Sequence, residues 1–384
     1  MYNVLLRLLP IGLFGAVASA QAAFPASSDD AAIVATIVQQ MQSPTIRSEG
    51  AVRAGVAVDG SWTVELGSGW LADVRGPQIP AELDARLQAI RLEVLLQREQ
   101  AGARPLPLEF RFNGLPLEAW FGDQSPSGSG RRTLATDAGV DVFVSASHGW
   151  YLHGGNTWRL QRPSRNGMVE DLVTPQFARR VVDALAQEAV SATLSRSEAS
   201  SAHPLAAKPW WQMAARYHAQ ALYPDRHDIW QSYADRGSPL REYNDDIRAR
   251  PLMANEIAAG ALVHLHTNAA ADASASGMMA FHQSQRSEDK RLGHVLLCAI
   301  REAVQRVPAY RRYPVRVQPH VGNYGENRLA WAPSILIELG FHTNPQDAAA
   351  LQDPLFQTAV ADGLAQGYLQ YRRGVGTGGA PVCR

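Results

Sequence analysis

Apolar and polar positions in the first third of the chain follow the patterns of a small α+β domain. Valines and a tryptophan alternate with polar residues around Asp59-Gly60, which predicts a hairpin. A helix follows, with apolar residues three or four positions apart: Leu83, Leu87, Ile90 and Val94. Strand-like alternation then returns and ends in an Asn113-Gly114 turn. We expect one domain over residues 25–122, and because it holds no histidine or cysteine, we expect catalysis elsewhere.

From residue 134 to residue 372, short apolar runs alternate with helical patterns. The predicted strands are 140–147, 189–195, 261–266, 314–318 and 334–339. This order predicts an α/β domain whose largely parallel, twisted sheet is flanked by helices. Residues 197–240 look like an insertion, because a loop-like stretch is followed by an aromatic one.

The sequence also indicates where two helices begin and where a linker separates the domains. Thr174 with Pro175 as the first helical residue, and Asn344 with Pro345 behind it, predict two helix N-termini. Residues 123–133 are rich in Ser and Gly and contain no large apolar residue, which predicts a linker. Residues 373–384 are expected to form a C-terminal tail.

The first 22 residues have the features of a secretory signal peptide. They carry one positive charge, Arg7, an apolar core, and small residues in an A-x-A pattern, and they are too short for a stable membrane span. The formal net charge is 0, and loss of Arg7 leaves 0 − 1 = −1. We therefore expect a periplasmic or secreted protein without stable membrane insertion after cleavage and without a nucleic-acid partner held by bulk charge.

Two cysteines stand in this exported chain, Cys298 and Cys383. They could pair in a disulfide. The helical pattern around Cys298 equally fits a buried core thiol. The sequence leaves both alternatives open.

Side chains that could carry chemistry cluster at the ends of predicted strands. His148 follows the first strand, while His266 and Glu338 end two later ones. In open α/β sheets, ligands bind beyond the carboxyl ends of the strands. Glu170, just before a helix, adds a second carboxylate. Each residue alone also fits a structural role, but two histidines and a carboxylate with an open position describe a hydrolytic zinc site.

Several segments follow in an order that resembles the zinc-dependent N-acetylmuramoyl-L-alanine amidases of the amidase 3 type. They are VFVSASHGW, then Glu170, then RPLMANEIAAGALVHLHTNA, then APSILIELGFHTNPQDAAALQD. The resemblance covers residues 138 to 372 and implies that Zn²⁺ is held by His148, Glu170 and His266, with Glu338 as the catalytic carboxylate. VSATLSR is similar to the family's second strand with its terminal arginine, here Arg196. The N-terminal domain resembles the germination-protein M type.

Three departures from the family pattern affect the predicted site. Ser145-Ala146-Ser147 replaces the usual Asp-Pro-Gly before the first histidine. The longer gap up to Glu170 contains His153, an alternative ligand to His148. His264 replaces the serine two positions before His266, and it is either a partner of the metal ligands or a core residue, the interpretation we favour.

The resemblance implies hydrolysis of the amide between N-acetylmuramic acid and the L-alanine of the peptidoglycan stem peptide. Glu338 would take a proton from the attacking water and pass it to the leaving amine. Two alternatives stay open: a zinc peptidase acting within muropeptides, and a non-catalytic wall-binding or regulatory protein derived from an amidase. The presence of all four chemical residues argues against the second. Stem-peptide preference and any activator protein are left open by the sequence.

Overall fold

The computed structural model describes residues 34–39, 53–56, 62–71, 74–103, 105, 108–122, 139–377 and 382–383. The predicted signal peptide and the predicted linker at 123–133 lie outside these residues. Among the described helices, none combines the length and hydropathy needed to cross a membrane.

The N-terminal part forms a four-stranded sheet in the order β1-β2-β3-β4. Its elements are β1 (Arg53–Val56), β2 (Trp62–Glu65), a 3₁₀ helix (Ser68–Leu71), α2 (Ala81–Gln100), β3 (Leu108–Phe112), β4 (Leu115–Pro116) and α3 (Leu117–Trp120). The predicted hairpin is confirmed, since β1 and β2 are antiparallel. Asn113 and Gly114 both have positive φ, 51° and 76°, as a tight hairpin turn requires. Within the described residues, this part of the chain therefore combines helices with a small mixed sheet.

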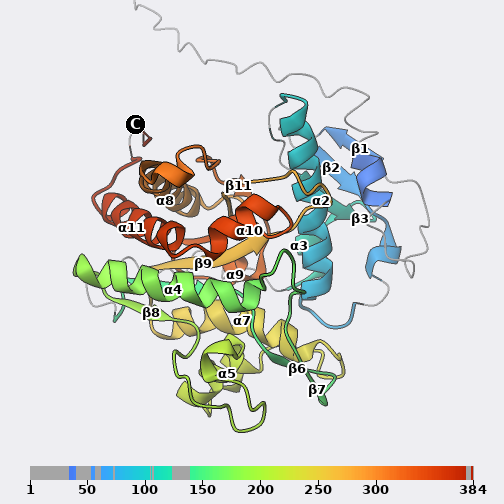
Figure 1. Cartoon of the computed structure of the whole chain (residues 1–384). Helices are drawn as coiled ribbons and strands as arrows, with labels where there is room; N and C mark the ends of the chain where they lie inside the picture. Colours follow the sequence, from blue (N-terminus) through green and yellow to red (C-terminus); the bar gives the residue numbers. More distant parts are fainter. Residues whose placement is uncertain are drawn as a thin grey trace, which may run out of the picture.

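Helix α2 has two apolar faces, and only one of them belongs to the small sheet. The predicted stripe from Leu83 to Val94 is buried against β2 and β3. Leu92, Leu95 and Leu96 instead form one cluster with residues of the larger domain. Polar contacts flank this second interface: the Ala81 amide donates to Asn244 Oδ1 at 2.7 Å, and Arg316 pairs with Glu99 at 2.8 Å. Figure 1 shows α2 standing between the small sheet and the larger domain.

The larger domain is built on a six-stranded sheet in the order β11-β10-β12-β9-β5-β8. Its strands are β5 (Val142–Ala146), β8 (Ala192–Leu194), β9 (Ala261–Asn268), β10 (Met279–His282), β11 (His320–Val321) and β12 (Ser334–Phe341). Pairing is parallel from β8 to β12, while β10 pairs antiparallel with β12 and parallel with β11, so β10 and β11 run opposite to the other four strands. A separate hairpin follows β5, formed by β6 (Tyr151–His153) and β7 (Thr157–Arg159). The predicted α/β class is confirmed.

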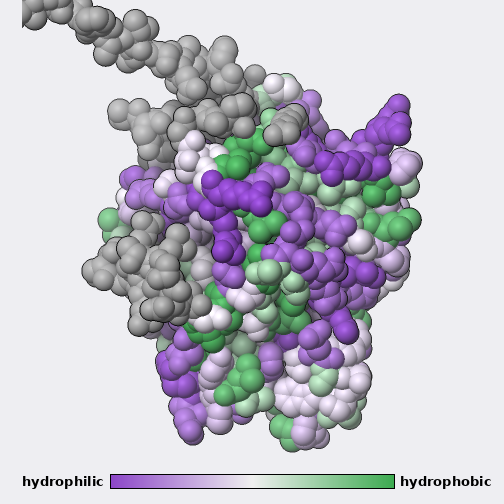
Figure 2. Space-filling view, turned by 90° about the vertical axis from the view of Figure 1, so that its left-hand side faces the viewer, coloured by the Kyte–Doolittle hydropathy of each residue, from purple (hydrophilic) through white to green (hydrophobic). Residues whose placement is uncertain are grey.

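Helices cover both faces of this sheet. They are α4 (Glu170–Gln187), α5 (Ala215–Leu222), α6 (His227–Trp230), α7 (Arg241–Glu256), α8 (Ser287–Arg306), α9 (Gly325–Arg328), α10 (Pro345–Gln352) and α11 (Pro354–Arg372), with 3₁₀ turns at Trp210–Gln212 and Pro308–Tyr310. α4, α8 and α11 share the main apolar cluster with one face, and α7 packs on the other. On the side of the molecule seen in Figure 2, hydrophilic residues cover much of the surface and hydrophobic ones form small scattered patches.

One predicted strand is absent from the sheet, and one strand of the sheet was not predicted. Residues 314–318 form no strand; Val315 makes one isolated bridge to Met278, and the alternating valines pack against the main cluster from the sheet edge. β10 was not predicted, because its four residues, MAFH, form a very short apolar run that ends in a histidine. The predicted cap at Asn344 is confirmed, since its side chain accepts from Gln346 N and Asp347 N.

Helix α4 begins at Glu170, four residues before the predicted cap, so Pro175 lies inside it. A proline within a helix leaves the carbonyl four residues earlier without a donor. Here that carbonyl belongs to Asp171, and Arg196 Nη1 donates to it at 2.9 Å. A side chain from the β8 end therefore supports the longer helix, and this extension makes Glu170 its first residue.

Candidate metal site

His148 lies in the turn after β5 and is almost fully buried, with 2% of its surface exposed. Thr174 supports this turn, since its Oγ1 accepts from Ser147 N at 3.2 Å and contacts Ser147 Oγ at 2.8 Å. These contacts stabilise the Ser-Ala-Ser sequence that departs from the family pattern. Burial lowers the pKa of His148 well below its ordinary value, with Arg162 and Arg250 acting in the same direction. His148 is therefore neutral and can act as a ligand.

Glu170 brings a carboxylate between the two histidines. Its Oε1 lies 3.1 Å from His266 Nδ1 and 3.9 Å from His148 Nε2. Burial opposes the charge, but the hydrogen bond with His266 and the nearby Arg162, 3.5 Å away, outweigh it and lower the pKa of Glu170 to about 2. The group is therefore an anion at neutral pH.

His266 lies near the end of β9, directly opposite Glu338 on β12. Burial disfavours its positive charge, yet Glu326 and Glu170 raise the pKa of His266 to about 9. The ring is thus protonated between two carboxylates in the metal-free protein. A metal ion that binds such a site must displace a proton.

Glu338 is a buried carboxylic acid within the otherwise apolar run of β12. Its Oε2 has no hydrogen-bond partner within the described part of the chain. Burial raises the pKa of Glu338 to about 8, and the carboxylates of Glu170 and Glu326 add to the rise, while His266 opposes it. Burial therefore favours the neutral form of this side chain.

The alternative histidines lie outside this group. His153 sits on β6, half-buried, with its Nδ1 3.1 Å from the Tyr151 hydroxyl. His264 is fully buried on β9, and its Nε2 lies 3.2 Å from Ser334 Oγ. Burial lowers the pKa of His264 to about 3, in keeping with a neutral core residue.

The arrangement fits a zinc ion. One ligand atom from each of His148, Glu170 and His266 lies within 4.8 Å of the others. His148 Nε2 is buried and lacks a hydrogen-bond partner among the described residues, as expected of a nitrogen meant for a metal. Two imidazoles and one carboxylate are also the donor set of several hydrolytic zinc sites, which keep a further position open.

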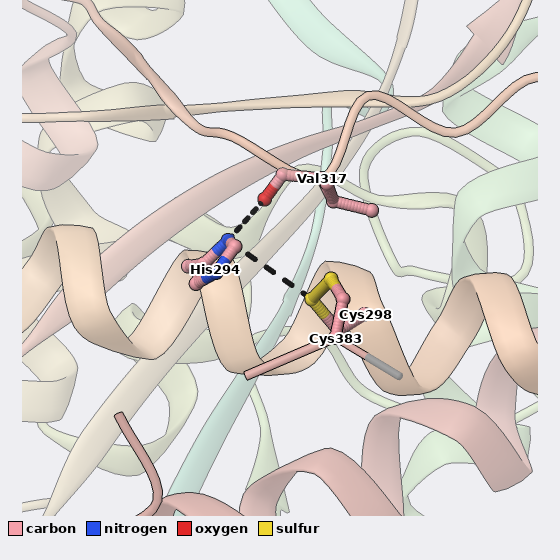
Figure 3. Close-up of a disulfide and its surroundings, with 4 residues drawn as sticks. All are labelled: His294, Cys298, Val317 and Cys383. Atoms are coloured by element: carbon pink, nitrogen blue, oxygen red, sulfur yellow. Dashed lines mark hydrogen bonds between the residues drawn. A yellow bond between two sulfur atoms is a disulfide. The ribbon is translucent and has the colours of Figure 1, made fainter. Parts of the chain in front are cut away.

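A second group of potential ligands has another explanation. His294, Cys298 and Cys383 lie close together, but the two cysteines form a disulfide with their Cα atoms 5.2 Å apart. Figure 3 shows His294 beside the disulfide, with its Nδ1 directed at the Val317 carbonyl at 2.7 Å. The pairing that the sequence left open is therefore present, and it ties α8 to the C-terminal tail.

Several buried residues of the site were not predicted. Glu326 on α9 lies 2.9 Å from His266 Nε2, and Arg250 on α7 lies 3.2 Å from His148 Nδ1. Both stand in polar stretches without a recognisable periodicity, so no sequence pattern indicated their role. The predicted arginine, Arg196, is buried and donates to the backbone carbonyl of His148, so it supports the site from behind.

Comparison with known proteins places this geometry in a family. A family model described as N-acetylmuramoyl-L-alanine amidase matches residues 142–370. The germination-specific N-acetylmuramoyl-L-alanine amidase of Bacillus subtilis (strain 168) is 26% identical over 133 residues, which cover 34% of this chain and 52% of that protein. The chain thus spans about half the length of that relative.

Two solved structures are also similar to this chain. The amidase AmiC2 of Nostoc punctiforme shares 19% identity, covers 61% of this chain and 97% of its own, and gives a TM-score of 0.39. Ami1 from Mycobacterium smegmatis shares 16% identity over 62% of this chain and 98% of its own, with a TM-score of 0.42. The family match spans more than half of the sequence and includes all four predicted site residues, and the chain therefore belongs to the N-acetylmuramoyl-L-alanine amidases.

Proposed function

We propose that this protein is a zinc-dependent hydrolase that cleaves the amide between N-acetylmuramic acid and L-alanine in peptidoglycan. The observation that carries the proposal is the convergence of His148, Glu170 and His266 in one buried group. The family match supports the reaction type. By the same proposal the protein acts on the cell wall in the periplasm or outside the cell.

His148, Glu170 and His266 would hold the zinc ion. When bound, zinc supplies Lewis-acid polarisation of a carbonyl and activation of water. Arg162, near Glu170 Oε2, keeps the Glu170 carboxylate charged as a ligand must be. Arg196 fixes the backbone of His148 through its carbonyl, so the first ligand is presented from a rigid turn.

Glu338 would act as the general base and then as the general acid. It lies in register with His266 on the neighbouring strand, which places its carboxyl group beside the metal ligands. Burial favours the protonated form of Glu338, whereas the charge of a bound zinc ion would favour the carboxylate, so the group could both accept a proton from water and return it to the leaving amine. The amide nitrogen cannot depart as an anion, so this second transfer is needed for bond cleavage.

The proposal is tested with defined muropeptides and mass spectrometry of the products. Release of the intact stem peptide together with glycan lacking a peptide identifies the amidase reaction. Fragments cut within the stem peptide would instead identify a peptidase, and absence of any product with zinc-loaded protein would favour the non-catalytic alternative. Glu338→Gln serves as the matched inactive control, because it preserves the shape of the side chain.

A further inference from the structure

Both ring nitrogens of His266 face carboxylates, and the two carboxylates lie on opposite sides of the ring. Glu170 Oε1 is 3.1 Å from Nδ1, on the side of His148. Glu326 Oε1 is 2.9 Å from Nε2, on the other side. The described ligand atoms that lie within 4.8 Å of one another come from His148, Glu170 and His266, and Glu326 is not among them. Glu326 therefore contacts a ligand from behind.

A buried arginine holds Glu326 in this position. Arg250, fully buried on α7, donates from Nη1 to Glu326 Oε1 at 2.6 Å. Its Nη2 donates to Asp246 and lies 3.2 Å from His148 Nδ1. Arg250 thus links Glu326, behind His266, to Asp246 on its own helix. Glu326 itself is only 3% exposed, so water cannot easily replace it as a partner.

This geometry determines which nitrogen of His266 can bind a metal. A neutral imidazole carries one N–H, and the other nitrogen offers a lone pair. If the proton resides on Nε2 and is donated to Glu326, the lone pair of Nδ1 points to Glu170 and His148. A carboxylate behind a metal-binding histidine fixes the tautomer, orients the ring and raises its basicity.

We propose that Glu326 is a positioning residue for the metal site, accepting the Nε2–H of His266 so that Nδ1 is presented to zinc. The inference rests on the proposed function only in assuming that His266 is a metal ligand. Glu326 touches neither substrate nor metal. It acts through His266 and is held for that purpose by Arg250.

Zinc affinity of the purified full-length protein tests this assignment. Loss of such a carboxylate typically weakens metal binding 10- to 100-fold. Competition with a chromophoric chelator should therefore give weaker zinc binding for Glu326→Gln, about 10-fold, because glutamine keeps a neutral acceptor. Glu326→Ala, which removes the acceptor, should be weaker still, toward 100-fold.

Asp289→Asn provides the matched control. Asp289 is also a buried carboxylate paired with an arginine, Arg286 at 3.0 Å, but it accepts from the Ser334 amide and does not reach a ligand. This variant should lose stability without a change in zinc affinity. Thermal unfolding of all variants separates general destabilisation from loss of metal. If Glu326→Ala fails to fold because Arg250 loses one of its two carboxylate partners, the zinc affinity of Glu326→Gln tests the inference.

A spectroscopic readout separates positioning from a purely structural role. In ¹⁵N-histidine NMR of the zinc-loaded wild type, His266 should show a protonated Nε2 and a metal-shifted Nδ1, and Glu326→Gln should move the Nε2–H signal. Wild-type affinity with an unchanged signal in Glu326→Gln would overturn the inference. Loss of zinc as complete as in His148→Ala would also overturn it, because Glu326 would then be a direct ligand. Neither readout uses activity, so failure of the amidase reaction alone leaves this inference standing.

Discussion

Alternate residues of β12 point to opposite faces of the six-stranded sheet, and the two sets differ in chemistry. Ile335, Ile337 and Leu339 belong to the main apolar cluster with α4, α8 and α11. Leu336 and Glu338 point to the other face, where Leu336 belongs to the same apolar cluster as the leucines of α2. β9 repeats the division: Val263 and Leu265 join the main cluster, whereas His264 and His266 lie opposite.

The difference between the faces lies in what covers them. The apolar face is closed by long helices of the same domain. The face that carries Glu338 and His266 is bordered by α7, by the short α9 and by α2 of the N-terminal part. A continuous apolar interface between a sheet and its helices has no room for a charged group. Where separate segments cover the sheet, they can place arginines and carboxylates around a site. Glu338 and His266 therefore lie on the face of the sheet that α7, α9 and α2 cover together.

The largest expected effect is the difference between substitutions at two adjacent residues of β12. Glu338→Gln should retain zinc and stability but lose activity by ~10²- to 10⁴-fold, the usual contribution of general acid–base transfer. Ile337→Ala, on the other face, should lower the free energy of unfolding by about 2–5 kcal/mol and leave the turnover of folded enzyme unchanged. Product release and denaturant unfolding on the same preparations check both. Near wild-type turnover in Glu338→Gln would make it a structural residue.

Removal of the N-terminal part tests whether α2 helps to cover the face of the sheet that carries Glu338 and His266. A protein starting at Arg131 should still fold cooperatively, because the main cluster lies wholly within the larger domain. It should be less stable by several kcal/mol, since each buried leucine of α2 contributes about 1.5–3 kcal/mol. Leu336 and Phe281 would become exposed and should bind a hydrophobic dye. Unchanged stability of the larger domain would show that α2 is not part of its cover.

The disulfide should stabilise the apolar side of the domain. Cys298 and Cys383 are 85 residues apart, and cross-links of this kind typically contribute about 2–4 kcal/mol. Cys383→Ser should lower the unfolding free energy by that amount and leave zinc affinity unchanged. Urea unfolding of the wild type with and without a reducing agent provides the control, and reduction should reproduce the effect of the variant.

The smallest effect concerns the ion pair between α2 and the larger domain. Glu99 and Arg316 are partly exposed, at 29% and 21% of their side chains, so water screens their attraction. Glu99→Gln should lower stability by about 1 kcal/mol or less, and the loss should shrink in high salt. A salt-independent loss of several kcal/mol would indicate a role beyond the ion pair.

Periodic elements were predictable from the sequence, and contacts between distant segments were not. The stripe from Leu83 to Val94 and the buried run of β12 depend on local spacing, and both are confirmed. The second face of α2 was hidden because Val94, Leu95 and Leu96 are consecutive apolar residues that point to different partners. Glu326 acquires its role only when α9 is brought against His266, and its surrounding sequence has no periodic pattern.

The central claim is that His148, Glu170 and His266 form one metal site. Zinc stoichiometry after dialysis tests it most directly. Wild type, Glu338→Gln and His153→Ala should each retain one zinc per chain, measured by atomic emission. His148→Ala should retain almost none, because a site with two remaining ligands binds the ion weakly. Full zinc stoichiometry in His148→Ala, or its loss in His153→Ala, would contradict the assignment.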